Sequence, residues 1–399
     1  MKSIKENKNT IKIFAAIGFC LLGDAMLYTV LPTRIELFAF SGAQLGIILA
    51  ANRIIRLFSN FWAASIYEKW NRTIPFNIAI VASIFITFSY GYFELFWQFL
   101  ILRLLWGFTF SLLRLKALLS IFDSGLPENM HGKLSGIFRS MSRTGYMVGM
   151  IFGGYLADAY NFSMSAYLLA ALSGLALVFI FGSKKETKID KKQKEKFQPN
   201  PKINMLKLIT SPQMFILMFM GFALNYTGLG LINSSYGLYL KNLFGNNILI
   251  LGFTIGVATL NGILLSTQSL FNLVLSPFLG NIADKYSINK IIPYLFVFQG
   301  ILMSLLSFFE SKFIAILAPT FIFINTAFLM ILLYINISNY QKSTVSKRMA
   351  GLTTAVDLGA ALGPLSLIFL NFGLTLPVLY FLGALLLITA GILHKLSIY

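Results

Sequence analysis

The chain has few of the residues on which disulfide scaffolds and many enzymes depend. Among its 399 residues there is one cysteine, Cys20, and there are two histidines, His131 and His394. A single cysteine excludes a framework of intramolecular disulfides. Two isolated histidines offer no metal cluster and no base beside a nucleophile. The sequence therefore predicts a protein that is not an enzyme and that needs no metal or other cofactor.

Charged residues are also scarce, at 12% of the chain, whereas 57% of the residues are hydrophobic and the mean hydropathy is +0.76. A soluble domain could not bury so much apolar surface, so most of the chain is expected to lie in lipid. No small-residue cleavage pattern follows the first apolar run, which is therefore expected to remain as a membrane span rather than to be removed as a signal peptide.

The apolar runs are numerous and long, and one membrane crossing takes about 20 residues. They predict twelve spans, at residues 13–32, 43–66, 74–93, 96–120, 134–156, 164–182, 212–233, 248–276, 291–309, 313–337, 350–371 and 375–394. A Lys-rich segment divides them, giving an N-terminal half at 1–183, a linker at 184–207 and a C-terminal half at 208–399. The expected fold class is an all-α membrane protein of two six-helix halves.

The positive charges predict the orientation of these spans. Of the 32 Lys and Arg residues, 22 fall on the side that carries both termini and the linker, and three fall opposite, at Arg34, Lys241 and Lys312. By the positive-inside rule both termini are expected in the cytoplasm, with the chain in the cytoplasmic membrane. Topology and anionic lipid headgroups account for the formal net charge of +18, so no nucleic-acid partner is predicted.

A short pattern recurs at corresponding places in the two halves. A small residue, three spacers, an acid and a base follow the second span at Ala64, Glu68 and Lys69. The same order follows the eighth span at Gly280, Asp284 and Lys285. Internal repeats of this kind are typical of secondary transporters, whose binding site lies near mid-membrane between the halves.

The recurring pattern resembles the G-x-x-x-D-[RK]-x-G loop motif of the major facilitator superfamily, and the N-terminal copy departs from it at Ala64, Glu68 and Asn71. The resemblance implies that Glu68, Lys69, Asp284 and Lys285 form a charge lock that is made and broken as the halves rock. The alternative is that each acid and base lies in a solvated turn at the membrane interface.

Two further patterns resemble the same family. Arg103 and Gly107 are similar to its R-x-x-x-G on the fourth span. The glycines of the fifth span, from Gly145 to Gly154, resemble the motif of its drug:proton antiporter branches, although Met150 stands where proline is expected. The eleventh span has the proline, in Gly359-x3-Gly363-Pro364. Glycines at every fourth position also let neighbouring helices pack closely, which is the alternative explanation for them.

Seven basic residues lie within the predicted spans, all in the N-terminal half, and only Asp24 and Asp357 oppose them. A cation at mid-depth costs about 2.5 to 3.5 kcal/mol on insertion scales, so these residues should face a polar interior. The excess of bases predicts a small organic anion as the substrate. The predicted substrate-binding residues are Arg53, Arg56, Arg103 and Arg143 from the N-terminal half, and Asn225, Gln268 and Asn272 from the C-terminal half. The alternative is that single arginines pair with helix-end carbonyls or with loop acids.

Asp24 and Asp357 are the candidates for proton coupling, because a carboxyl group inside the membrane can bind or release a proton as the cavity opens to either side. A static salt bridge from Asp24 to Arg53 or Arg143 is the alternative. Together these features predict a monomeric, proton-coupled transporter that works in lipid by alternating access, with export favoured. Uptake by proton symport and flipping of a lipid are the other functions that the sequence allows.

Overall fold

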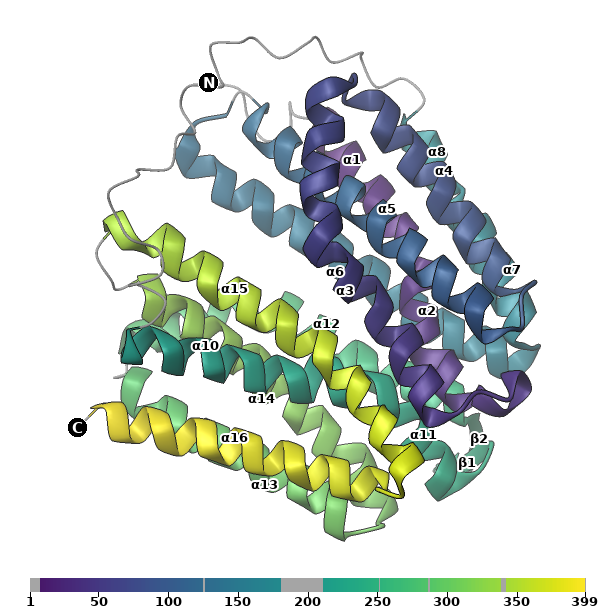
Figure 1. Ribbon diagram of the computed structural model, residues 1–399, viewed down its shortest axis with the longest axis vertical. Helices are drawn as coiled ribbons and strands as arrows, with labels where there is room; N and C mark the ends of the chain where they lie inside the picture. Colours follow the sequence, from purple (N-terminus) through teal and green to yellow (C-terminus); the bar gives the residue numbers. More distant parts are fainter. Residues whose placement is uncertain are drawn as a thin grey trace.

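The computed structural model describes residues 8–124, 126–180, 211–250, 252–285, 288–338 and 342–398. Within these residues the protein is almost entirely helical, and its helices are arranged in two groups (Figure 1). The predicted linker at 184–207 lies outside the described residues.

The N-terminal half begins with a span that is bent rather than straight. Helices α1 and α2 and the short 3₁₀ segment η2 follow one another through Thr33, and the α3 helix then starts at a capping box. The Ser41 hydroxyl accepts from the Gln44 amide, and the Gln44 side chain accepts in return from the Ser41 amide. The helical segments of this half are α1 (Lys8–Cys20), α2 (Leu22–Val30), η2 (Leu31–Thr33), η3 (Ile35–Phe38), α3 (Gly42–Lys69), α4 (Thr73–Tyr90), α5 (Phe96–Phe122), α6 (Glu128–Ala159), α7 (Phe162–Ser173) and α8 (Leu175–Ile180).

The C-terminal half contains more irregular helix than the N-terminal half. Its first span is interrupted by a π-helical turn, η5, and helices α13, α14 and α15 contain an internal proline, at Pro293, Pro319 and Pro364 respectively. Its elements are α10 (Pro212–Asn225), η5 (Tyr226–Ile232), α11 (Asn233–Phe244), β1 (Asn247–Ile250), β2 (Phe253–Gly256), α12 (Val257–Lys285), α13 (Ile288–Phe308), α14 (Lys312–Ser338), α15 (Lys342–Leu365), η6 (Ser366–Phe372) and α16 (Leu376–Ile398).

The eighth span starts later than the apolar pattern predicted. Residues 248–250 and 253–256 belong to the strands of an antiparallel hairpin, in which β1 pairs with β2 from Asn247 opposite Gly256 to Ile250 opposite Phe253. Gly245 and Gly252 have φ angles of +73° and +85°, in the left-handed region that ends a helix or permits a tight turn. The predicted start at residue 248 is therefore wrong, because a short apolar run alone does not distinguish a helix from a strand.

Nine helical stretches among the described residues are long and apolar enough to cross a membrane. The remaining three crossings of the twelve-span fold are α3, α6 and α12, which run through the same bundle. Helices α3 and α6 pack against the opposite half, and they carry arginines that line the space between the halves rather than facing lipid. The apolar pattern of the sequence and this architecture together confirm a multi-pass membrane protein.

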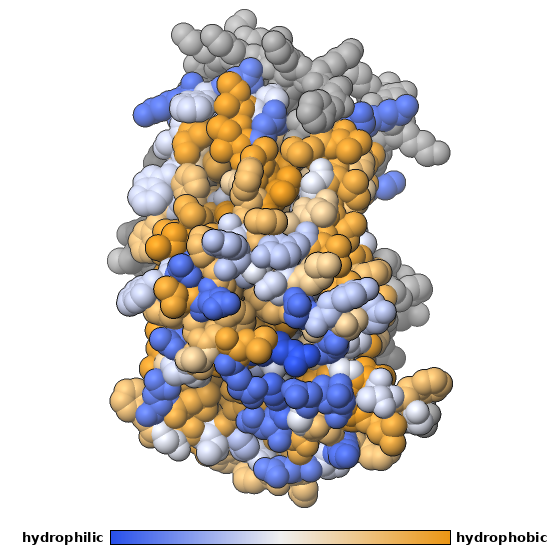
Figure 2. Space-filling model, turned by 90° about the vertical axis from the view of Figure 1, so that its right-hand side faces the viewer, coloured by the Kyte–Doolittle hydropathy of each residue, from blue (hydrophilic) through white to orange (hydrophobic). Residues whose placement is uncertain are grey.

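The two halves touch at one end of the molecule and diverge toward the end at which α1 begins and α16 ends (Figure 1). They meet near α11, the β1–β2 hairpin and the start of α12. On the face that carries α4 and α7, hydrophobic side chains cover the upper part and polar side chains gather in the lower part (Figure 2). Exposed apolar residues on α4, such as Ile78 and Phe85, suit contact with lipid acyl chains.

Candidate functional site

A central cavity of about 320 Å³ lies between the two halves. Most of its wall comes from α2, α3, α5 and α6 of the N-terminal half, and the rest comes from η5, α11, α12 and α15 of the C-terminal half. Its polar lining residues are Tyr28, Asn52, Arg53, Arg56, Asn60, Arg114, Arg139, Ser142, Arg143, Tyr146, Asn233, Gln268, Ser269 and Asp357. The cavity thus brings together four of the seven predicted substrate-binding residues, namely Arg53, Arg56, Arg143 and Gln268, with one candidate proton site, Asp357.

The two α3 arginines project into the cavity from one face of the helix, as their i,i+3 spacing requires. The Arg56 guanidinium lies 5.1 Å from the centre of the Phe110 ring, and its Nε donates to the Asn52 carbonyl at 3.1 Å. The Arg53 guanidinium lies 5.4 Å from the centre of the Tyr28 ring. Aromatic faces attract cations, so each guanidinium packs favourably against its ring.

Positive charge also comes from α5 and α6. Arg139 and Arg143 are one helical turn apart on α6, and Arg114 lies on α5. Among the described residues, none of the five cavity arginines forms an ion pair with a carboxylate, and Asp357 is the one acid in the cavity wall. The cavity is therefore strongly electropositive, with room for an anion.

The C-terminal half contributes neutral polar groups to the opposite wall, at Gln268, Ser269 and Asn233. Two predicted substrate-binding residues lie outside this wall. Asn225 is buried and donates to the Gly221 carbonyl at 3.0 Å and to the Met330 sulfur at 3.2 Å. Asn272 donates to the Gln268 carbonyl at 2.7 Å. Both amides donate to groups of the C-terminal half itself rather than facing the described cavity.

Arg103 and Asp24 form an ion pair behind the cavity wall, with their side chains 0% and 1% exposed. Arg103 also donates to the Tyr28 hydroxyl at 3.1 Å and to the Ile48 carbonyl at 3.2 Å. The sequence analysis considered Arg53 and Arg143 as salt-bridge partners of Asp24, and the structure places Arg103 there instead. Arg103 is consequently not a cavity residue in this arrangement of the halves.

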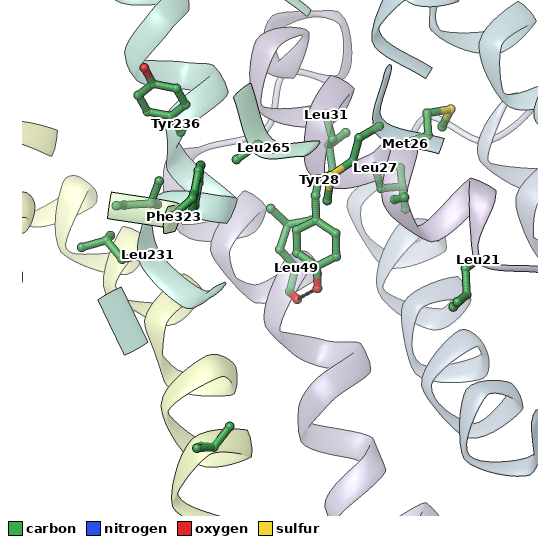
Figure 3. Packing of buried hydrophobic residues seen from close by; sticks show 14 of the residues in the cluster. Leu21, Met26, Leu27, Tyr28, Leu31, Leu49, Leu231, Tyr236, Leu265 and Phe323 are labelled. Atoms are coloured by element: carbon green, nitrogen blue, oxygen red, sulfur yellow. Dashed lines mark hydrogen bonds between the residues drawn. The ribbon is translucent and has the colours of Figure 1, made fainter. Parts of the chain in front are cut away.

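Three cavity residues connect the wall to this buried pair. Asn52 donates to Asp24 at 3.1 Å, and the Tyr146 hydroxyl donates to the other Asp24 oxygen. Tyr28 accepts from Arg103 and donates to the Leu49 carbonyl at 3.2 Å, a contact that Figure 3 shows within the apolar packing around it. A change in the charge of Asp24 would therefore alter its hydrogen bonds with Tyr146 and Asn52, two residues that line the cavity.

The predicted charge lock is only partly described. Glu68 and Lys69 are exposed at the end of α3, and neither forms an ion pair with another described residue. The nearby ion pair joins Arg72, which follows α3, to Asp123 at the end of α5. The side chains of Asp284 and Lys285 lie outside the described part of the chain, so the lock stays a prediction.

The end where the halves meet is closed by polar contacts that the sequence analysis did not find. Asp158, at the end of α6, accepts from Arg34 at 2.9 Å. It also accepts from the amide and hydroxyl of Thr259 in α12, at 2.6 and 2.7 Å. A second contact between the halves joins Lys241 to Glu36 at 2.7 Å. In the sequence, Asp158 is distinguished only by its position just after the end of the fifth predicted span, at residue 156.

Backbone contacts reinforce this closed end. A Cβ atom on Gly154 of α6 would collide with the Ala258 carbonyl of α12, and one on Gly262 of α12 would collide with the Met150 carbonyl of α6. Gly154 belongs to the glycines predicted to allow close helix packing, and it does so here between the halves, as does Gly262, which the sequence analysis did not single out.

A larger cavity, of about 530 Å³, lies between α1, α2 and α6. Its lining is apolar apart from Ser140 and Thr144, and it lies across α6 from Arg139 and Arg143. It offers no group that would bind a charged solute, so the central cavity is the better candidate for the substrate site.

A family model described as Major Facilitator Superfamily matches residues 13–265 of this chain. Multidrug resistance protein MdtG of Escherichia coli (strain SMS-3-5 / SECEC) is 24% identical over 404 residues, covering 97% of this chain and 92% of that protein. MdtG of Enterobacter lignolyticus (strain SCF1) is 26% identical over 264 residues, which cover 63% of this chain and 57% of that protein.

Two solved structures share the fold. The nucleoside transporter NupG superposes with a TM-score of 0.75 at 14% identity, covering 98% of this chain and 99% of that one. A bacterial homologue of the human lysosomal transporter Spinster, in an inward-facing and occupied conformation, superposes with a TM-score of 0.72 at 14% identity, covering 97% and 95%. The resemblance inferred from the loop motifs is thereby confirmed, and the chain belongs to the Major Facilitator Superfamily, as a membrane transporter of small molecules.

Proposed function

We propose that this transporter is proton-coupled and moves a small organic anion across the cytoplasmic membrane by alternating access, with export as its direction. The observation that carries the proposal is the charge of the central cavity, where five arginines and one carboxylate line the wall. Unpaired cations in a site of low dielectric constant are costly, and an anionic ligand would lower that cost. The full-length match to a multidrug resistance protein supports export.

The distribution of charge in the loops supports both termini in the cytoplasm. With that orientation, the closed end at Asp158 faces outward and the divergent end faces inward, so the described arrangement corresponds to an inward-facing state. Proton-coupled uptake of an anion uses the same cavity, and the sign of solute flux under an imposed pH gradient separates it from export.

The first prediction concerns the cavity arginines. An arginine fork holds a carboxylate or phosphate through charge-assisted hydrogen bonds, each contributing about 1.5 to 3 kcal/mol. Arg56→Gln and Arg143→Gln should therefore each weaken anion binding by roughly 10- to 100-fold. The measurement is the ligand-dependent shift in thermal unfolding of the purified full chain, across a panel of organic anions, cations and neutral solutes.

Lys395→Gln is the matched control, because it removes one positive charge at the end of α16, away from the cavity lining. It should leave anion binding unchanged. Unchanged affinity in well-folded Arg56 and Arg143 variants would refute the anionic substrate, and so would a lipophilic cation as the best ligand of the panel.

A further inference from the structure

Two backbone carbonyls of the C-terminal half face the central cavity, at Leu229 and Ala360. In α15, the carbonyl of Ala360 would normally accept from the amide of residue 364. That residue is Pro364, which has no N–H group, so the Ala360 carbonyl lacks its helical partner. Leu229 lies within the π-helical turn η5, a distortion that is frequent at functional sites.

Close backbone packing brings these two carbonyls together. A Cβ atom on Gly363 of α15 would collide with the Cα atom of Gly230 in η5, so the two segments touch through their glycines. As a result, one donor group can reach both the Leu229 and the Ala360 carbonyl.

That donor comes from the opposite half. The Nη1 atom of Arg53 donates to the Leu229 carbonyl at 3.0 Å and to the Ala360 carbonyl at 2.7 Å. A guanidinium carries five N–H donors, and these two bonds occupy only Nη1. The edge formed by Nε and Nη2 makes no hydrogen bond to another described residue, and the guanidinium plane lies over the Tyr28 ring.

We propose that the Leu229 and Ala360 carbonyls position Arg53 for anion binding, so that the specificity of the cavity for anions depends on Pro364, which does not touch the anion. This inference rests on the proposed function. The carbonyls hold Nη1, and a carboxylate or phosphate binds bidentately to the Nε and Nη2 edge. The anion does not compete with the carbonyls, because it uses different donors.

The benefit of this arrangement is preorganisation. A free arginine loses rotamer entropy when it binds a ligand, and an arginine already fixed at Nη1 and over Tyr28 loses less. Because its two acceptors lie in the C-terminal half, Arg53 is held only while the halves touch at this level. Anion affinity is therefore linked to the arrangement of the halves, as alternating access requires.

The same device occurs a second time in the chain, away from the cavity. Pro319 of α14 deprives the Ala315 carbonyl of its helical partner, and the Tyr236 hydroxyl donates to that carbonyl. Pro319→Ala is thus a matched control for Pro364→Ala, because both restore a helical N–H that competes with a side-chain donor.

The test is a titration of the full chain in lipid nanodiscs with citrate, a tricarboxylate, followed by thermal unfolding. In Pro364→Ala the new amide of residue 364 takes the Ala360 carbonyl, and citrate should bind about three- to tenfold more weakly, as expected for one lost hydrogen bond. Pro319→Ala should bind citrate like the unaltered chain. Adding Pro364→Ala to Arg53→Gln should weaken binding no further, because the positioning acts only through Arg53.

The two proposals fail in different ways. If citrate and other organic anions do not bind the unaltered chain, the anionic-substrate proposal fails. If Arg53→Gln weakens binding while Pro364→Ala leaves it unchanged, or if the two effects add, the positioning role is refuted and the anion site survives. Tighter binding in Pro364→Ala would refute it as well, because it would mean that the carbonyls compete with the anion.

Discussion

At the scale of single residues, the most consequential contact is the ion pair between Asp24 and Arg103. Both side chains are excluded from solvent, and Asn52 and Tyr146 provide further hydrogen bonds to the carboxylate. Breaking a buried pair by removing one partner is far more damaging than removing both, because the remaining charge has no compensation. Arg103 is therefore expected to stabilise the fold, whereas the cavity arginines are candidates for ligand binding.

The prediction at this scale separates a structural arginine from a ligand-binding one. Arg103→Gln should destabilise the folded protein by about 3 to 5 kcal/mol, because it leaves the Asp24 carboxylate buried and unpaired. Adding Asp24→Asn to Arg103→Gln should recover part of that loss. Thermal unfolding midpoints and protein accumulation in the membrane measure the effect.

Arg56→Gln provides the comparison, since its guanidinium lines the cavity and forms no ion pair with a carboxylate of the described residues. It should lower anion affinity with little change in the unfolding midpoint. Equal stability of the Arg103→Gln and Arg56→Gln variants would contradict the assignment.

At the scale of helices, the closed end depends on a carboxylate that serves both halves. Asp158 lies in the last turn of α6 and accepts from the amide of Thr259, the third residue of α12, so it caps the first turn of a helix in the other half. Arg34 pairs with its second oxygen. The contact between Lys241 and Glu36 also joins the halves, but the Glu36 side chain is 69% exposed. An exposed pair of this kind contributes little to stability.

Asp158→Ala should therefore loosen the closed end, and Glu36→Ala should not. Loss of a cap costs about 0.5 to 2 kcal/mol, enough to raise the population of a minor open state severalfold. Spin labels at Tyr160→Cys and Leu249→Cys, two exposed positions on opposite halves, report the distance across this end, and the native Cys20 is buried.

A longer distance component should appear in Asp158→Ala and be absent from Glu36→Ala. Identical distance distributions in the two variants would show that the cap does not hold the halves together.

Much of the fold was predictable from single helices, because each span must be apolar over a fixed length regardless of its neighbours. The start of α12 was not, since the apolar residues of the hairpin fit a helix equally well apart from Gly252, whose positive φ permits the turn between the strands. The site was predictable in part. Counting charges located the cavity arginines, but the pairing of Asp24 with Arg103 depends on packing between residues far apart in the chain.

At the scale of the whole molecule, the two halves contribute different groups to the central cavity. The lining is strongly basic on the N-terminal side and mostly neutral on the C-terminal side. The five cavity arginines come from the N-terminal half, and the C-terminal half supplies carbonyls, amides and Asp357, the one acid among the described lining residues. The N-terminal half would therefore supply the positive charge that binds an anion, and the C-terminal half would mainly supply hydrogen-bonding groups that orient it. Asp24 lies in the first half too, joined to the cavity wall through Tyr146. Protonation at Asp24 and anion binding would thus act on the same group of helices.

The last prediction concerns this coupling and tests Asp24→Asn. The neutral amide mimics a protonated carboxyl group, and its oxygen can still accept from Arg103, which also keeps the Tyr28 hydroxyl and the Ile48 carbonyl as acceptors. Because the variant cannot change its charge, flux driven by a pH gradient should be abolished. Exchange of the anion at equal pH needs no net proton movement and should continue.

Both rates, the pH-driven flux and the exchange at equal pH, are measured in proteoliposomes and normalised to folded protein, with Asp357→Asn in parallel. Full pH-driven flux in Asp24→Asn together with its loss in Asp357→Asn would place the proton site on the cavity wall. Undiminished flux in both variants would exclude coupling through either carboxylate.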